Sequence, residues 1–213
     1  MINSIKKLSL SSILLLLVSC TAVLPPMNQQ VTQQFKDKPP QIHHWQKANN
    51  QTLLILTFSG GGTRAAAFSY GVLKGLRDSR IMRKGEPIPL LSEVDLISSV
   101  SGGSFTAAYY GLFGKQIFSD YESRFLKHPI QSELIHRWLS PKSWGKLGSN
   151  FFNRSDLAAE YYSQQIFQNK NFSDMREDMP LIIINSTDIS AGMPFSFIPS
   201  NMNWICSDLG SYP

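Results

Sequence analysis

Ser101 lies in the stretch ISSVSGGSF, in which an apolar run ends at a serine surrounded by very small residues. A nucleophilic serine on a sharp strand-to-helix turn needs tiny residues two positions before it and two after it, because larger side chains would collide where strand and helix cross. Gly103 meets this need and Gly102 relieves crowding further, whereas Ser99 stands where glycine is usual. A helix beginning just after Ser101 would direct its positive end at the hydroxyl. The stretch therefore predicts a nucleophile.

A glycine triplet, Gly60 to Gly62, follows an earlier apolar run in the stretch SGGGTR. Three glycines let backbone N–H groups converge on one point and bind an anion, either a phosphate or the oxyanion of acyl transfer. No Gly-Lys-Ser/Thr follows, and Ala65 replaces the last glycine of the dinucleotide-binding pattern, so both phosphate motifs fail. A phosphate-binding module is therefore only a distant alternative. Paired with the serine turn, the triplet predicts an oxyanion hole.

Short apolar runs and helical patterns alternate around these two motifs. We expect strands at 53–58, 93–100 and 179–190, each buried, and helices at 63–80 and 102–114. The region from 115 to 170 has a helical pattern, and the alternating run at 193–200 could pair with the third strand. A strand, a glycine turn and a helix thus occur twice in succession. This order predicts an α/β domain with a mostly parallel sheet.

Together the two motifs resemble the start of the patatin-like phospholipase family, in its bacterial lipoprotein branch. The likeness includes LTFSGGGTRAAAFSYGVLKGL, DLISSVSGGSFTAAYYG and INSTDISAGMPFSF, and it runs from Leu53 to the last residue. It implies a three-layer α/β/α fold and the hydrolysis of acyl esters in lipids. By this resemblance Ser101 is the nucleophile, and Gly60, Gly61 and Gly62 form the oxyanion hole. Arg64 either holds the glycine loop in shape or is an ordinary surface ion-pair partner.

The base that should activate the serine is missing from the expected place. Only His128 and His136 follow Ser101, both before the third strand, which disfavours a Ser-His-Asp triad. The resemblance implies instead a Ser–Asp dyad with the Asp in a later Asp-Gly pair, and the sequence contains no Asp-Gly. We expect the downstream aspartates to cap or brace turns rather than act as the base. They are Asp120, Asp156, Asp174, Asp178, Asp188 and Asp208.

The resemblance extends to the last residue of the sequence. We therefore interpret the chain as a patatin-like domain whose C-terminal part, with the catalytic Asp, is missing. The expected function is a lipid acyl hydrolase with a serine nucleophile, acting on membrane lipid or another acyl ester. Without the base, only residual catalysis is expected. The alternative is therefore a catalytically dead, membrane-anchored lipoprotein fragment that at most binds lipid or a partner. Neither interpretation requires a cofactor or a metal ion.

The N-terminal residues predict export and lipidation. Lys6 and Lys7 precede a short apolar run that cannot span a bilayer as a mature helix, which is typical of a signal peptide. The run ends at Leu-Val-Ser-Cys20, which resembles a bacterial lipobox with Cys20 as the lipidated residue. A secretory signal that happens to contain a cysteine is the alternative. Thr21 favours the outer membrane if the cell is Gram-negative.

These observations divide the chain into a signal peptide at 1–19, a membrane-proximal tether rich in Pro, Gln and Asn at 20–50, and the N-terminal part of the patatin-like domain at 51–213. The predicted location is the bacterial cell envelope. The net charge of +5 falls to +3 without Lys6 and Lys7 of the predicted signal peptide, which is too small to argue for nucleic acid as a partner. With Cys20 lipidated, Cys206 has no disulfide partner, and its apolar context predicts a buried structural thiol.

Overall fold

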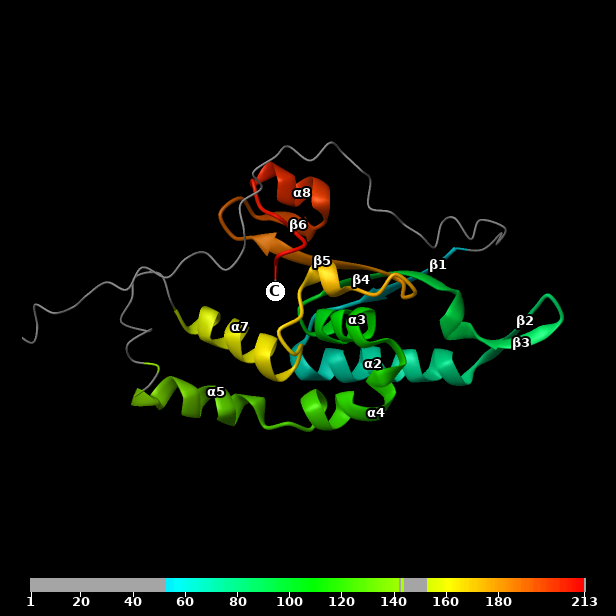
Figure 1. Ribbon diagram of the computed structural model, residues 1–213, viewed down its shortest axis with the longest axis horizontal. Helices are drawn as coiled ribbons and strands as arrows, with labels where there is room; N and C mark the ends of the chain where they lie inside the picture. The colour runs from blue at the N-terminus through cyan, green and yellow to red at the C-terminus, as the bar shows by residue number, and fades with distance from the viewer. Residues whose placement is uncertain (1–52, 142, 144–152, 213) are drawn as a thin grey trace, which may run out of the picture. The chain divides into compact units, whose positions relative to one another are not determined.

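The computed structural model describes residues 53–141, 143 and 153–212 (Figure 1). The predicted signal peptide and tether, with Cys20, lie outside the described residues. The described chain divides into two compact units. One is helical and comprises residues within 129–162, and the other is an α/β unit made from the residues before 129 and after 162.

A four-stranded sheet, in the order β1-β4-β5-β6, forms the centre of the α/β unit. The strands are β1 (Leu54–Phe58), β4 (Val94–Val100), β5 (Leu181–Asp188) and β6 (Met193–Phe197). The first three run parallel and β6 pairs antiparallel with β5, so the expected strands and the pairing of the fourth are confirmed. The chain therefore has a mixed α/β fold with a mostly parallel central sheet.

Helices α2 (Gly62–Asp78) and α3 (Gly102–Phe113) follow β1 and β4 and lie together on one face of the sheet (Figure 1). An antiparallel hairpin of β2 (Arg80–Arg83) and β3 (Glu86–Pro89) leads from α2 towards β4 through a 3₁₀ turn at Leu90–Glu93. Gly114, at φ 56°, ends α3 as expected, since glycine takes a left-handed conformation without penalty.

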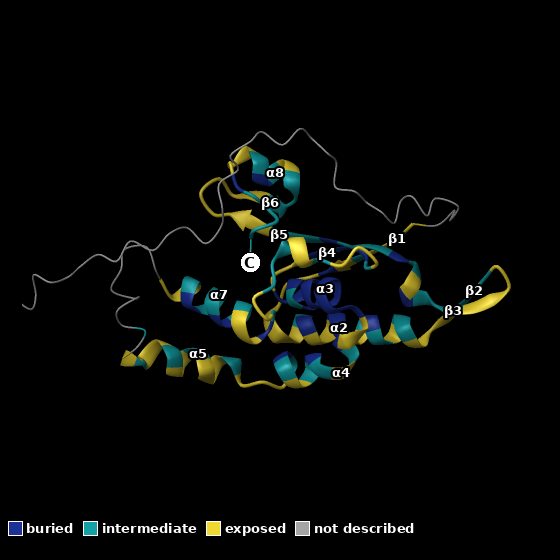
Figure 2. Ribbon diagram, viewed as in Figure 1, coloured by how far each residue is buried: buried dark blue, intermediate teal, exposed yellow. Residues whose placement is uncertain are grey.

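The core is centred on α3. Every residue of this helix except Phe105 is buried, whereas α2 buries one stripe and exposes the opposite side (Figure 2). A helix that is apolar on all sides is stable only when it is covered on all sides. Below it, α4 (Ile117–Tyr121) and a π-helical turn (Glu122–Leu126) add Tyr121 and Phe125, whose rings stack near Tyr109.

The remaining helices are shorter or belong to the helical unit. In that unit α5 (Ile130–Leu139) and α7 (Arg154–Gln165, whose last three residues fall in the α/β unit) contribute two cation–π pairs. The Arg137 guanidinium lies 4.9 Å from the ring centre of Tyr161, and that of Arg154 lies 4.5 Å from that of Trp138. The last elements are a 3₁₀ turn (Phe172–Asp174) and α8 (Pro199–Trp204). Across the described residues, no helix combines the length and apolarity that crossing a membrane requires.

Three expectations about burial are wrong. The first strand is not fully buried, because among the described residues it has only β4 beside it: Ile55 is 47% exposed and Phe58 alone is buried. The third expected strand, β5, is not fully buried either, since Ile182 is its one buried residue and its last three residues are exposed. Cys206 is exposed rather than buried. The short helix α8 buries only Met202, and the turn after it, with Cys206 at φ 55°, leaves the thiol on the surface.

Candidate active site

Ser101 occupies the sharp turn between β4 and α3 in a backbone conformation that serine rarely adopts. Its φ is 51° and its ψ is −119°, a region normally taken by glycine. A non-glycine residue held there stores roughly 1–3 kcal/mol of strain. The residue is exposed, and it is the N-cap of the twelve-residue helix α3. Ser101 thus lies at the tip of β4, in front of the positive end of the buried helix α3.

The two glycines after Ser101 are required by close contacts with the first strand–helix unit. A Cβ added to Gly102 would lie 2.1 Å from the Gly62 carbonyl oxygen. A Cβ added to Gly103 would lie 2.7 Å from the Cβ of Phe58 and 2.8 Å from the Ser59 carbonyl oxygen. Real Cβ atoms do not approach backbone this closely, so only glycine fits at either place. These contacts press the glycine loop directly against the serine turn.

The glycine triplet lies beside the serine side chain. A Cβ on Gly60 would be 3.3 Å from the Ser101 Cβ and 3.8 Å from its Oγ, while Gly61 (φ 140°) and Gly62 (φ 62°) take conformations that L side chains rarely adopt. Among the described residues, no main-chain or side-chain oxygen accepts a hydrogen bond from the amides of Gly60 or Gly61. The loop therefore brings uncommitted donors close to the hydroxyl. An oxyanion hole needs uncommitted backbone donors near the nucleophile, and the loop supplies such donors.

Ser99, which stands where glycine is usual, is accommodated by the neighbouring strand. It is 1% exposed, and its Oγ donates to the Ile183 carbonyl oxygen at 3.2 Å. Because a buried hydroxyl needs a partner, this bond lets serine replace glycine without an unsatisfied group. The departure from the usual pattern is thus compatible with the turn.

Asn185 braces the turn from β5, a role the sequence analysis did not find. Val100 and Asn185 are partners in the parallel register. The Asn185 amide nitrogen donates to the Ser98 Oγ and to the Ser99 carbonyl oxygen, each at 3.0 Å, and its oxygen accepts from the Ser196 Oγ at 2.6 Å. A polar residue interrupting the apolar run LIIIN was the only sequence signal.

Thr106 joins the two helices that carry the site, and it was also missed. It is fully buried, and its Oγ1 donates to the Ala66 carbonyl oxygen at 2.9 Å and lies 2.9 Å from the Tyr121 hydroxyl. A single threonine within an apolar helix gives no sequence signal for such a contact. Its effect is to fix α3, and with it Ser101, against α2.

The aspartates after Ser101 all have other hydrogen-bond partners. Four accept from backbone amides of nearby turns: Asp156 from Asn153, Asp174 from Asn171, Asp188 from Ser190, and Asp208 from Ser211. Asp120 accepts from the Tyr109 hydroxyl and Asp178 from Arg176. The expectation that these carboxylates brace local structure agrees with the contacts.

The remaining predicted site residues are not joined to the serine. His128 and His136 are exposed, and no hydrogen bond within the described chain links Ser101 to a His, Asp or Glu. Arg64 is exposed at the start of α2, and it forms no ion pair with another described residue, so its role in shaping the loop stays a prediction. No cluster of three or more His, Cys, Asp or Glu side chains is present among the residues that the structure describes.

A mixed α/β sheet with a serine on a strained strand–helix turn and a glycine loop against it defines the class of α/β proteins with a nucleophile elbow. The profile of the family described as patatin-like phospholipase matches residues 56–203, and the chain belongs to this family. Membership implies, at the general level, a hydrolase of lipid acyl esters. Among curated proteins nothing matches the chain, and nothing matches among solved structures.

Proposed function

We propose that the protein is a serine acyl hydrolase of membrane lipids or related acyl esters, with Ser101 as the nucleophile. The Ser101 Oγ attacks the ester carbonyl carbon and gives its proton to a base. The carbonyl oxygen becomes an oxyanion that accepts hydrogen bonds from amides of Gly60, Gly61 and Gly62. The alcohol leaves with that proton, and water then cleaves the acyl-serine to release the acid. The strained serine in contact with Gly60 carries this proposal.

The second candidate is a catalytically dead, membrane-anchored lipoprotein that at most binds lipid or a partner. One observation favours it: each described aspartate after Ser101 already accepts a hydrogen bond from a turn or a side chain. A serine with its oxyanion hole but without its base retains a residual acceleration of about 10³–10⁴ over water in the best-studied case. In both candidates we propose that Cys20 carries the lipid anchor in the cell envelope.

Labelling with a fluorophosphonate, followed by mass spectrometry of the labelled peptide, separates the two candidates. The hydrolase predicts labelling of Ser101 that disappears in Ser101→Ala and persists in Ser79→Ala, a change of an exposed serine at the end of α2. Labelling with little turnover of nitrophenyl esters would identify a competent serine without an effective base. No labelling of the folded chain would exclude the hydrolase and leave the lipid-binding candidate.

A further inference from the structure

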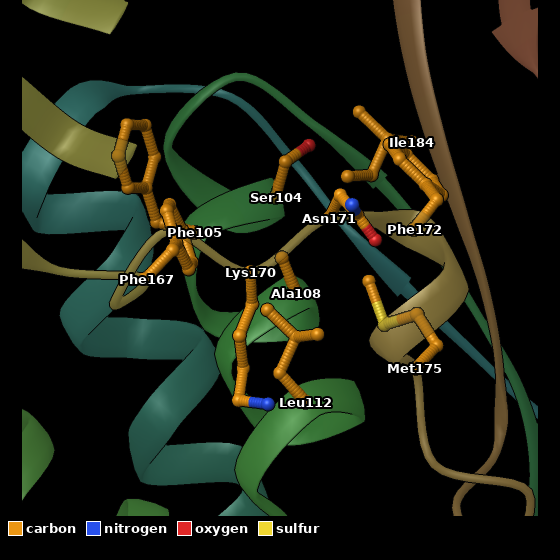
Figure 3. Close-up of a pocket in the computed structure, with 10 residues that line it drawn as sticks. All are labelled: Ser104, Phe105, Ala108, Leu112, Phe167, Lys170, Asn171, Phe172, Met175 and Ile184. Carbon is orange, nitrogen blue, oxygen red and sulfur yellow. The ribbon is translucent and has the colours of Figure 1, made fainter. Parts of the chain in front are cut away.

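A half-open pocket lies alongside the helix that begins at Ser101 (Figure 3). Its volume is about 170 Å³. One wall is α3, the opposite wall is the segment from Phe167 to Met175, and Ile184 of β5 closes the side towards the sheet. All of these residues belong to the α/β unit.

The pocket begins near the end of α3 that follows Ser101. The residues of α3 that line it are Ser104, Phe105, Ala108 and Leu112. They follow Ser101 by three, four, seven and eleven positions, the spacing of a single stripe along a helix. The pocket therefore begins one turn below the serine and follows the helix for about 12 Å, at 1.5 Å per residue.

The lining is apolar between two polar ends. In Figure 3 the Ser104 hydroxyl points away from Ala108 and Leu112, and the Lys170 ammonium lies at the opposite end of the pocket near Leu112. Ser104 is 8% exposed, and its buried Oγ has no hydrogen-bond partner. The Lys170 Nζ is 3.8 Å from the Asp174 carboxylate, and its side chain is 37% exposed.

An unpartnered buried hydroxyl is costly, and an oxygen of a bound ligand would satisfy it. The ligand that fits is an ester: its oxygens would lie between Ser101 and Ser104, and its hydrocarbon chain would fill the apolar part below. A dry cavity of about 150 Å³ holds a benzene ring, so a pocket of this size takes roughly six carbon atoms. A longer chain would reach the Lys170 ammonium, which is unfavourable for methylene groups.

We propose that this pocket binds the acyl chain of the substrate, and that Ala108 and Lys170 set its length, so that hexanoyl and octanoyl esters are preferred over palmitoyl esters. The proposal rests on Ser101 being the nucleophile. The length of the pocket then limits the length of the acyl chain that can bind. Ser104 at its neck holds the ester oxygen, and Lys170 at its far end marks where the apolar part stops.

The first test measures binding without catalysis. Ligand-observed NMR of sodium hexanoate is recorded with the Ser101→Ala chain, alone and combined with Ala108→Phe, whose ring would occupy the pocket. The matched control is Ala67→Phe, on the exposed side of α2. We expect hexanoate binding to be lost only with Ala108→Phe. Binding that is equal in the two phenylalanine variants would overturn the proposal.

The second test measures the chain-length profile of nitrophenyl esters from butyrate to palmitate. Hexanoate and octanoate should be the best substrates, and Ala108→Phe should lower kcat/KM for them by about tenfold or more, since small volume changes in such pockets have effects of this size. Lys170→Met should move the optimum to longer chains, whereas Lys127→Met, the change of an exposed ion-paired lysine, should not. An optimum at palmitate that Lys170→Met leaves unchanged would contradict the proposal. If no ester is turned over but hexanoate binding still depends on position 108, the pocket assignment stands and the proposed function fails.

Discussion

Two strand–helix units of the α/β unit, β1 with α2 and β4 with α3, meet at the candidate site, and their connecting turns differ in backbone strain. After β1, the turn is made of glycines, which take φ 140° and 62° without penalty, and α2 leaves one side exposed. After β4, the turn is made by Ser101 at φ 51°, and α3 is buried on all sides (Figure 2). The unit that would supply hydrogen-bond donors is relaxed, and the unit that would supply the nucleophile is strained and rigidly held. A strained serine persists only because its surroundings over-determine it.

The largest predicted effect comes from the contact between the units. Gly102→Ala would place a Cβ 2.1 Å from the Gly62 carbonyl oxygen, so we expect a loss of about 3 kcal/mol or more in the free energy of unfolding. Gly71→Ala in α2 is the matched control, because nothing lies within 4 Å of its added Cβ. It should stabilise the protein by about 0.5–1 kcal/mol. Urea unfolding followed by circular dichroism measures both, and equal effects would show that the units do not touch as described.

The next effect concerns the bond between the two helices. Thr106→Val keeps the shape of the side chain but removes the hydroxyl that joins Ala66 to Tyr121, so we expect a loss of about 2 kcal/mol in the free energy of unfolding. Thr57→Val, at an exposed position of β1, should change it by less than about 0.5 kcal/mol. The same unfolding measurement applies. A Thr106→Val change as small as that of the control would mean that the helices are held by apolar packing alone.

The backbone strain at Ser101 can be measured by substituting a residue that adopts the same conformation without strain. Ser101→Gly should raise the free energy of unfolding by about 1 kcal/mol, because glycine accepts φ 51° without strain, while the gain is limited by the greater freedom of glycine in the unfolded chain. Ser101→Ala keeps the strain and should leave stability nearly unchanged. Gly62→Ala is the reciprocal change in the relaxed unit and should cost about 1 kcal/mol, since its Cβ meets no atom but its φ is 62°. Ser101→Gly no more stable than Ser101→Ala would argue against a strained turn.

The smallest effect is a loss of stability at high pH that originates in buried tyrosines of α3 and α4. Burial, with a smaller contribution from the charge of Asp178, raises the pKa of Tyr110 to about 12, and burial also raises the pKa values of Tyr109 and Tyr121. Tyrosines in the unfolded chain ionise at about pH 10. The stability that these raised pKa values contribute is therefore fully present below that pH and is lost as the pH rises towards about 12. Urea midpoints should therefore fall through this window, less steeply in Tyr110→Phe. Tyrosinate absorbance that rises before unfolding would contradict the burial of these side chains.

The sequence predicted those features that depend on local spacing. The serine turn followed from small residues on both sides of Ser101, and the parallel sheet followed from two repeats of strand, glycine turn and helix. Features that depend on distant neighbours were not predicted. The exposure of β1 depends on which strands lie beside it, that of Cys206 on how the chain turns after α8, and the bonds of Thr106 and Asn185 on residues 40 and 86 positions away.

The central claim is that the Ser101 hydroxyl faces amide hydrogens of the glycine loop, and the most direct measurement is a crystal structure of the protein after reaction with a fluorophosphonate. We predict a phosphorus atom bonded to the Ser101 Oγ, with the phosphoryl oxygen accepting hydrogen bonds from at least two of the amides of Gly60, Gly61 and Gly62. An adduct on another residue, or a phosphoryl oxygen turned away from the glycine loop, would contradict the account.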